Sequence, residues 1–218
     1  MRKEKEASYS YIESIISQES DLKQKARSLS EELGLEGISI SPTEARIIQF
    51  FVQQKPRRKI VEIGTLTGLS ALYFLEALTE EGQLWTLEKS ELHAEKASEV
   101  LKDYIRTGRC HLVVGDAREK LNEISAQGPF DAIFIDGNKA AYMDYWNWAQ
   151  AHISVGGVIL VDNIFLSGSV WGDTSSQKFS EKQIRIVDGL NKAVSQNEAF
   201  NSIIVPTTEG LLVAVKKG

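Results

Sequence analysis

Short apolar runs alternate with segments in which apolar residues recur at helical spacing, from residue 59 almost to the end of the chain. The runs are short and contain β-branched or aromatic side chains, which is typical of buried strands. They lie at 59–63, 83–87, 111–114, 131–135 and 157–161. The helical segments lie at 68–78, 91–104, 118–126, 139–152 and 180–196. This alternation predicts a doubly wound α/β fold with a mostly parallel sheet.

The chain ends in a predicted β-hairpin. Two apolar runs at 202–205 and 211–215 are separated by Pro206-Thr207-Thr208-Glu209-Gly210. Such a pair is typical of antiparallel strands joined by a turn. We therefore expect a seven-stranded sheet whose last strands are antiparallel and lie at or near one edge.

The N-terminal part of the chain is predicted to be helical. Apolar stripes over 7–34 predict one or two helices, and Ser41-Pro42-Thr43-Glu44 is a typical helix start with a capping serine and an early proline. These helices are amphipathic, so we expect them to pack on the sheet or on a partner. The whole chain, 1–218, is predicted to be one domain, with N-terminal helices (1–56) and a sheet core (57–218).

Oxygen-bearing side chains follow two consecutive predicted strands. Asp136 follows the fourth strand, and Asp162 and Asn163 follow the fifth. The carboxyl ends of neighbouring parallel strands open into one crevice, so these side chains can converge there with Lys139. Carboxylate and amide oxygens suit magnesium or calcium rather than zinc. Asp162 and Asn163 alone could simply cap a turn; with Asp136 and Lys139 the metal site is the better interpretation.

A glycine-bearing turn joins the first strand to its helix. Gly64 permits a sharp turn, and Gly68 lets the helix begin close to a ligand whose carboxylate the Ser70 hydroxyl and backbone amides could bind. Glu88, at the end of the next strand, suits ribose hydroxyls. Leu66 replaces the middle glycine of a dinucleotide-binding turn, which disfavours a pyrophosphate. A cofactor with an amino-acid tail, such as S-adenosylmethionine, fits better; a turn that binds no cofactor is the alternative.

Composition narrows the class of protein. The chain has 218 residues and a net charge of −5, which argues against a large nonspecific nucleic-acid surface. Cys110 is the only cysteine, so an intrachain disulfide is excluded. No apolar run approaches the roughly 18 residues of a membrane helix, and the first residues do not resemble a signal peptide. We expect a cytoplasmic protein.

These segments together resemble the magnesium-dependent catechol and caffeoyl-CoA type O-methyltransferases, especially their small bacterial members. The match runs from about Ile38 to Lys217, and its most specific parts are Asp136-x-x-Lys139 and Asp162-Asn163. The supporting segments are Ser41–Glu44, Val61–Thr65, Gly68–Leu72, Thr86–Glu88, Gly115–Ala117, Phe134–Tyr142 and Pro206–Leu211. The resemblance implies a class I, Rossmann-like methyltransferase. It would move a methyl group from S-adenosylmethionine to one of two vicinal hydroxyls of a catechol-like or caffeoyl-like aromatic.

The resemblance also implies roles for individual residues. Asp136, Asp162 and Asn163 would hold Mg²⁺, or another divalent cation such as Ca²⁺ or Mn²⁺, and Lys139 would be the general base. Asp136 would also lie near the sulfonium and amino end of the cofactor. The other implied cofactor-binding residues are Ile40 in a closing loop, Glu62, Gly64, Thr65 and Ser70 at the methionine end, Glu88 at the ribose, and Asp116 and Ala117 at the adenine.

The chain departs from the family near the acceptor. The family usually has a bulkier or charged residue where Gly137 and Asn138 stand. Animal catechol enzymes place a glutamate near the substrate, and the alignable position here is close to Glu181-Lys182. The identity of the acceptor is therefore less constrained than the class of reaction.

The expected partner is a small aromatic diol, and other functions remain as alternatives. A tRNA hydroxyuridine O-methyltransferase is the main alternative, and it would need a basic surface, for which Arg57-Arg58-Lys59, Arg106 and Arg109 are candidates. A scaffold without chemistry is disfavoured because the metal-binding set is intact, and a dinucleotide dehydrogenase because the middle glycine is missing. We expect no membrane partner, and a homodimer by family analogy.

Overall fold

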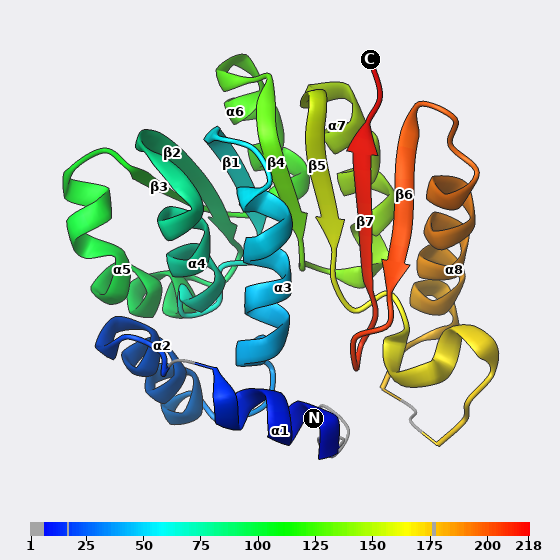
Figure 1. The fold of residues 1–218 in the computed structure, drawn as a ribbon, viewed down its shortest axis with the longest axis horizontal. Helices are drawn as coiled ribbons and strands as arrows, with labels where there is room; N and C mark the ends of the chain where they lie inside the picture. Colours follow the sequence, from blue (N-terminus) through cyan, green and yellow to red (C-terminus); the bar gives the residue numbers. More distant parts are fainter. Residues whose placement is uncertain (1–6, 17, 176–177) are drawn as a thin grey trace.

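The computed structural model describes residues 7–16, 18–175 and 178–218 (Figure 1). Its α-helices are α1 (Ala7–Ile15), α2 (Asp21–Glu32), α3 (Pro42–Gln53), α4 (Leu69–Ala77), α5 (Glu91–Arg106), α6 (Ala117–Ile124), α7 (Tyr142–His152) and α8 (Glu181–Ser195). Its strands are β1 (Arg57–Ile63), β2 (Leu78–Glu88), β3 (Cys110–Val114), β4 (Phe130–Ile135), β5 (Ile153–Val161), β6 (Phe200–Val205) and β7 (Leu211–Lys216). Three 3₁₀ segments complete it: η1 (Ser125–Gln127), η2 (Lys139–Ala141) and η3 (Leu166–Trp171).

The strands form one sheet in the order β3-β2-β1-β4-β5-β7-β6. β1 to β5 pair in parallel, whereas β7 is antiparallel to both β5 and β6. The predicted doubly wound sheet with an antiparallel hairpin at one edge is confirmed. The strand order reverses between β1 and β4, which is where ligands bind in open α/β sheets.

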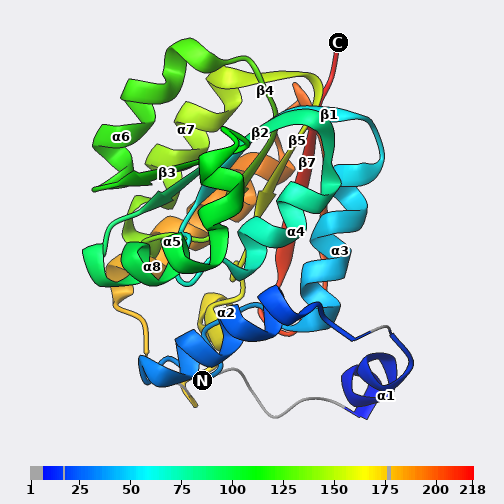
Figure 2. The ribbon, with the colours of Figure 1, turned by 90° about the vertical axis from the view of Figure 1, so that its left-hand side faces the viewer.

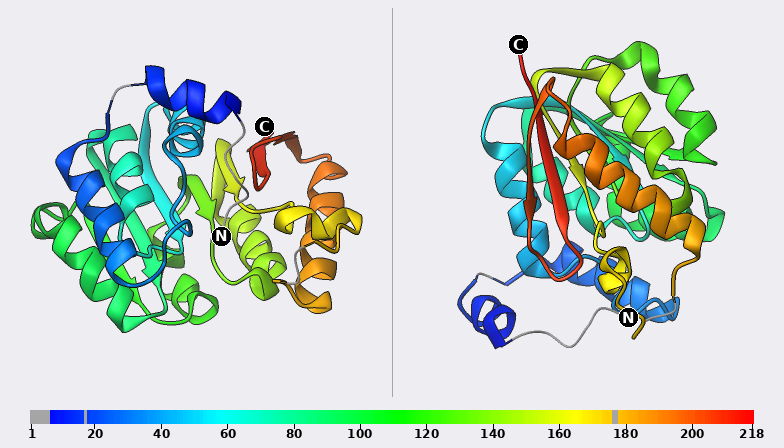
Figure 3. Two further views of the ribbon diagram at one scale, coloured as in Figure 1. Left: turned by 90° about the horizontal axis from the view of Figure 1, so that it is seen from below. Right: turned by 90° about the vertical axis from the view of Figure 1, so that its right-hand side faces the viewer.

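Helices cover both faces of the sheet. Helices α3, α4 and α5 pack on one face and α6, α7 and α8 on the other (Figures 2 and 3). Successive residues of a strand point to opposite faces, so Ala132 and Phe134 of β4 join one core and Ile133 and Ile135 join the other. The central strands are thus apolar on both sides, which holds their carboxyl ends in fixed relative positions.

Helices α1 and α2 lie beyond the end of the sheet towards which the parallel strands point, whereas α3 runs alongside it (Figure 1). The predicted start of α3 is confirmed by a capping box, in which the Ser41 hydroxyl accepts from the Glu44 amide and the Glu44 carboxylate accepts from the Ser41 amide. Helix α2 buries Ala26 and Leu29 in the core, whereas α1 buries no residue. Within the described part of the chain, no helix has the length and apolarity needed to span a bilayer.

Two strands begin earlier than the sequence pattern predicts. β5 starts at Ile153 rather than at residue 157, and β2 starts at Leu78 rather than at residue 83. The pairing of β5 with β4 shifts register between Phe130 and Ala132. β5 nevertheless continues through this irregularity, which includes Gly156 and Gly157. Glycines that look like a strand boundary in the sequence lie within a paired strand here.

Candidate active site

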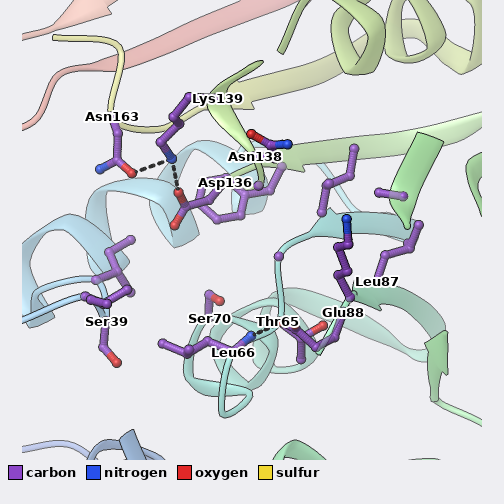
Figure 4. Close-up of a pocket in the computed structure, with 18 of the residues that line it drawn as sticks. Ser39, Thr65, Leu66, Ser70, Leu87, Glu88, Asp136, Asn138, Lys139 and Asn163 are labelled. Atoms are coloured by element: carbon purple, nitrogen blue, oxygen red, sulfur yellow. Dashed lines mark hydrogen bonds and ion pairs between the residues drawn. The ribbon is translucent and has the colours of Figure 1, made fainter. Parts of the chain in front are cut away.

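A cavity of about 520 Å³ lies at the carboxyl ends of β1 and β4, where the strand order reverses (Figure 4). Glu62 and Asp162 do not line it; they are buried at the ends of β1 and β5, with exposed fractions of 0% and 1%. The other predicted site residues all line it: Ile40, Gly64, Thr65, Ser70, Glu88, Asp116, Ala117, Asp136, Lys139 and Asn163.

Gly64 brings the turn after β1 against the end of β4. Its φ of +103° is a conformation that residues with a side chain rarely adopt. A Cβ at this position would also overlap the carbonyl oxygen of Asp136. The Asp136 amide donates to the carbonyl oxygen of Ile63 at 2.9 Å. The predicted cofactor turn and the predicted metal ligand are therefore in direct contact.

Glu62 is a fully buried carboxyl group beside this turn. Burial raises its pKa to about 8, and the nearby carboxylates of Asp136 and Glu88 act in the same direction. Its Oε2 accepts a hydrogen bond of 2.6 Å from the Thr86 hydroxyl, which also bonds the Thr65 hydroxyl. Hydrogen bonds from the Ser70 and Thr86 side chains favour the charged form and only partly offset the effect of burial.

Glu88 is the last residue of β2, and its side chain is hydrogen-bonded to the turn after β1. Its Oε2 accepts from the Leu66 amide at 2.8 Å, and its Oε1 accepts from the Ser90 amide at 2.8 Å. These bonds hold Leu66 at a φ of +51°. The carboxylate is thereby fixed at the cavity wall, where further lone pairs can accept hydroxyl groups.

Asp116 lies at the N-terminus of α6, opposite the turn. It accepts from the Arg118 amide at 3.0 Å and from both Nε and Nη2 of the Arg118 guanidinium. Lys89 donates to it at 3.1 Å. These donors, led by the Arg118 side chain, hold the pKa of Asp116 well below its ordinary value. The residue is therefore an anion of fixed orientation beside Ala117.

Lys139 lies at the centre of the other half of the cavity. Its Nζ is 2.8 Å from Asp136 Oδ1 and 2.8 Å from Asn163 Oδ1 (Figure 4). It is also 2.6 Å from the phenol oxygen of Tyr142. Asp162 Oδ2 is reached by Asn163 Nδ2 at 3.3 Å. Side chains from the ends of β4 and β5 thus converge on one cation, the lysine ammonium.

This arrangement fits a metal ion. The Oδ1 atoms of Asp136 and Asn163 both contact one positive charge, the Lys139 ammonium. The ammonium stands in for a metal cation at this point. Two carboxylates and an amide oxygen are hard ligands, which suit Mg²⁺, Mn²⁺ or Ca²⁺. Among the described residues no group of three or more His, Cys, Asp and Glu has metal-binding geometry.

The loop after β5 has an unusual backbone. Asn163, Leu166 and Ser167 have φ values of 58°, 48° and 53°, a region that non-glycine residues seldom adopt. The buried carboxylate of Glu209 holds the loop by accepting from the Ser167 amide at 3.1 Å and from its hydroxyl. Asparagine tolerates this conformation better than most residues. Strain stored at such a position is common in functional sites.

The cavity lining also contains residues that the sequence interpretation missed. Ser167, Lys178, Phe179 and Glu209 line it, whereas Glu181 is an exposed residue of α8 outside its lining. Tyr142, to which the sequence interpretation gave no individual role, is fully buried and bonded to Lys139. Its spacing of three residues from Lys139 was the available signal, since that spacing places both on one side of a helical turn.

Gly137 and Asn138 have structural explanations. A Cβ on Gly137 would lie 3.1 Å from the Ile63 side chain and 3.2 Å from the Tyr145 ring, which occupies the space a larger residue would need. Asn138 accepts from the Ala140 amide at 3.1 Å and so begins η2. Together they shape the segment that leads from Asp136 to Lys139.

Comparison with known proteins identifies the family. The sequence model of the O-methyltransferase family matches residues 13–217. The chain belongs to the O-methyltransferase family. This methyltransferase is 29% identical to a catechol O-methyltransferase of Niastella koreensis over 211 residues, covering 95% of each chain. It is 32% identical to a catechol O-methyltransferase of Mycobacterium tuberculosis over 149 residues, or 68% of this chain and 67% of that one.

A solved structure supports the same conclusion. The methyltransferase superposes on the O-methyltransferase TomG of Streptomyces achromogenes, determined in complex with SAM, with a TM-score of 0.86 and 25% identity. The match covers 97% of this chain and 96% of that one. The resemblance to the catechol and caffeoyl-CoA type enzymes, and the enzyme class, are confirmed.

Proposed function

We propose that this methyltransferase moves the methyl group of S-adenosylmethionine to one of two vicinal hydroxyls of a catechol-like or caffeoyl-like ring, with a divalent cation bound. One observation carries the proposal: Lys139 Nζ lies 2.8 Å from both Asp136 Oδ1 and Asn163 Oδ1. A base candidate and two hard oxygen ligands therefore occupy one cavity with the turn after β1.

The cofactor assignment is supported by the turn and by a relative. TomG, whose structure matches this chain, is in complex with SAM. S-adenosylmethionine supplies a methyl group that its sulfonium has already activated. The Ser70 hydroxyl and the turn amides would bind its carboxylate, and Glu62 would lie behind them at the methionine end. Glu88 would accept the ribose hydroxyls, and Asp116 and Ala117 would flank the adenine.

The cation assignment is supported by the donor set. Asp136, Asp162 and Asn163 would hold the ion at the mouth of the sheet. A bound divalent cation stabilises a deprotonated hydroxyl near neutral pH. The strained backbone of the loop after β5 would place the Asn163 side-chain oxygen among the ligands of this cation.

Lys139, in its neutral amine form, would take the proton of the hydroxyl that becomes methylated. Its Nζ is held by the phenol of Tyr142, whose hydroxyl donates in turn to the carbonyl oxygen of Asp162 at 3.0 Å. The base is therefore fixed relative to the metal ligands. Holding a base and a nucleophile in one geometry supplies a large part of an enzymatic rate enhancement.

The surface weighs against tRNA as the acceptor. Arg57 is buried, and its guanidinium donates to the carbonyl oxygens of Val52 and Gly156. Arg109 Nη2 donates to two carbonyl oxygens near the end of α4. Two of the basic side chains that a nucleic-acid surface would need are thus hydrogen-bonded to backbone carbonyls within the fold.

The test is radiolabelled methyl transfer to catechols, caffeoyl esters, matched monophenols and undermodified tRNA, each with and without chelator. We expect transfer to the diols alone, loss of transfer with chelator, and recovery with Mg²⁺. Transfer to tRNA only would contradict the acceptor class. Transfer that persists in chelator would contradict the metal requirement.

We also propose that the methyltransferase is a homodimer. Tyr11 and Ile15 on α1 and Phe50 on α3 are 66%, 64% and 63% exposed, and the two helices contact each other, which suits a covered surface. Sedimentation equilibrium should give twice the mass of the chain, and Phe50→Asp should lower it. A monomer at every concentration would contradict this assembly.

A further inference from the structure

Helix α2 is bonded to two walls of the cavity that are far apart in sequence. On one side Arg27 Nη1 donates to the carbonyl oxygen of Ile40 at 3.0 Å. On the other, the Thr67 hydroxyl donates to the carbonyl oxygen of Ala26 at 2.8 Å. Ile40 and Thr67 both line the cavity, and both are buried. Consecutive residues of one helix therefore connect the loop before α3 to the turn after β1.

The Arg27 guanidinium is held in one orientation. Its Nε and Nη2 lie 2.5 and 2.7 Å from the two carboxylate oxygens of Glu19, whose side chain is 9% exposed. The Tyr73 hydroxyl of α4 donates to Glu19 Oε1 at 2.8 Å. A bidentate pair fixes the plane of the guanidinium, so Nη1 is directed at Ile40.

The loop has a second connection to α2. The Ser39 hydroxyl donates to the Ser30 hydroxyl at 3.2 Å, and Ser30 donates to the carbonyl oxygen of Leu35 at 3.3 Å. These neutral bonds are longer than those of Arg27. The charged contact is thus the strongest hydrogen bond that joins the loop to the helix.

We propose that Arg27 is a positioning residue for cofactor binding, because it holds the 37–40 loop in the conformation that completes the cavity opposite the 64–68 turn. The proposal rests on the proposed S-adenosylmethionine site. A loop that is already ordered loses less conformational entropy when a ligand binds. The coupling is reciprocal, so the cofactor must in turn stabilise the docking of α2.

Lys23 provides a matched control. It lies one turn earlier in α2, its Nζ is 2.6 Å from Glu76 of α4, and it lies 3.8 Å from the centre of the same Tyr73 ring. Both of these contacts are with α4 rather than with the loop. Arg27→Met and Lys23→Met each remove one positive charge and one ion pair from α2, but only Arg27→Met releases Ile40.

Calorimetric titration with S-adenosylmethionine tests the proposal. We expect Arg27→Met to weaken binding about tenfold, and Lys23→Met to leave it within about twofold of the wild type. Arg27→Lys retains a positive charge beside Glu19, so the variant should keep the fold. It lacks the second guanidinium nitrogen that donates to Ile40, so S-adenosylmethionine binding should weaken as much as in Arg27→Met. Equal affinity in wild type and Arg27→Lys would overturn the proposal.

Hydrogen exchange separates positioning from general stability. In the wild type the cofactor should slow amide exchange in the 37–40 loop and in α2. In Arg27→Met it should still slow exchange at the 64–68 turn but no longer in the 37–40 loop, and equal protection of the loop in both proteins would overturn the proposal. A wild type that fails to bind S-adenosylmethionine would instead reject the proposed function on which this inference rests.

Discussion

The phenol oxygen of Tyr142 lies 2.6 Å from Lys139 Nζ, and the same hydroxyl donates to the carbonyl oxygen of Asp162. The predicted base is thereby joined to the main chain of a predicted metal ligand. Burial, together with the carboxylates of Asp136 and Asp162, holds the pKa of Tyr142 well above its ordinary value. The phenol thus stays neutral and can donate and accept at once.

Removing this hydroxyl should impair turnover without affecting the cofactor. Tyr142→Phe leaves the ring in the core but deprives Lys139 of one partner. We expect kcat to fall about tenfold and the free energy of unfolding to fall by about 1 kcal/mol. The affinity for S-adenosylmethionine, measured by calorimetry, should not change. An unchanged kcat would show that Lys139 needs no support from the phenol.

Removing the predicted base should have a larger effect. Lys139→Ala should lower kcat about a thousandfold, within the range for loss of a general base, while S-adenosylmethionine binding remains close to that of the wild type. Lys192→Ala is the control, since it breaks only a surface pair with Asp188. Activity retained by Lys139→Ala across the pH range would remove this residue from the mechanism.

The metal site can be tested by binding rather than by activity. Asp162→Asn keeps the shape of a buried residue but removes its charge, and cation affinity depends on ligand charge. We expect Mn²⁺ binding, followed by calorimetry, to weaken about tenfold or more. Asp188→Asn removes a surface carboxylate and should leave binding unchanged. Equal affinity in both variants would mean that the ion binds elsewhere.

Glu62 should make stability depend on pH. Its pKa is about 8 in the folded chain against 4.5 ordinarily, so between these values the folded state retains a proton that the unfolded state has lost. Its contribution to the free energy of unfolding must therefore fall as pH rises through this window, by at most about 1.4 kcal/mol per pH unit. Urea denaturation of Glu62→Gln at pH 5, 6.5 and 8 should give a flatter profile than the wild type. Parallel profiles would contradict the shift.

Two glycines should respond to alanine in opposite directions. Gly64→Ala places a Cβ against the Asp136 carbonyl at a φ of +103°, and should cost at least about 2 kcal/mol of stability. Gly189 lies inside α8 with open space around it, so Gly189→Ala should raise stability by up to about 1 kcal/mol. Thermal denaturation measures both. A tolerated Gly64→Ala would mean that the turn can move away from β4.

Much of the fold could be predicted because its signals are local. Strand and helix periodicity, the Ser41–Glu44 start of α3 and the terminal hairpin each depend on residues within one element. The candidate site was partly predictable for a related reason. Once strands are parallel, their carboxyl ends share an edge, so the residue types after β4 and β5 indicate the chemistry there.

The sequence by itself determined the order of the elements and placed Asp136, Asp162 and Asn163 at strand ends. Only the tertiary structure decided which side chains meet. Arg27 reaches Ile40 across 13 positions, Lys139 reaches Asn163 across 24, and Ser167 reaches Glu209 across 42. Such contacts form only when burial of the whole core has offset the entropy of closing the intervening chain. No pattern within a single helix or strand contains that information.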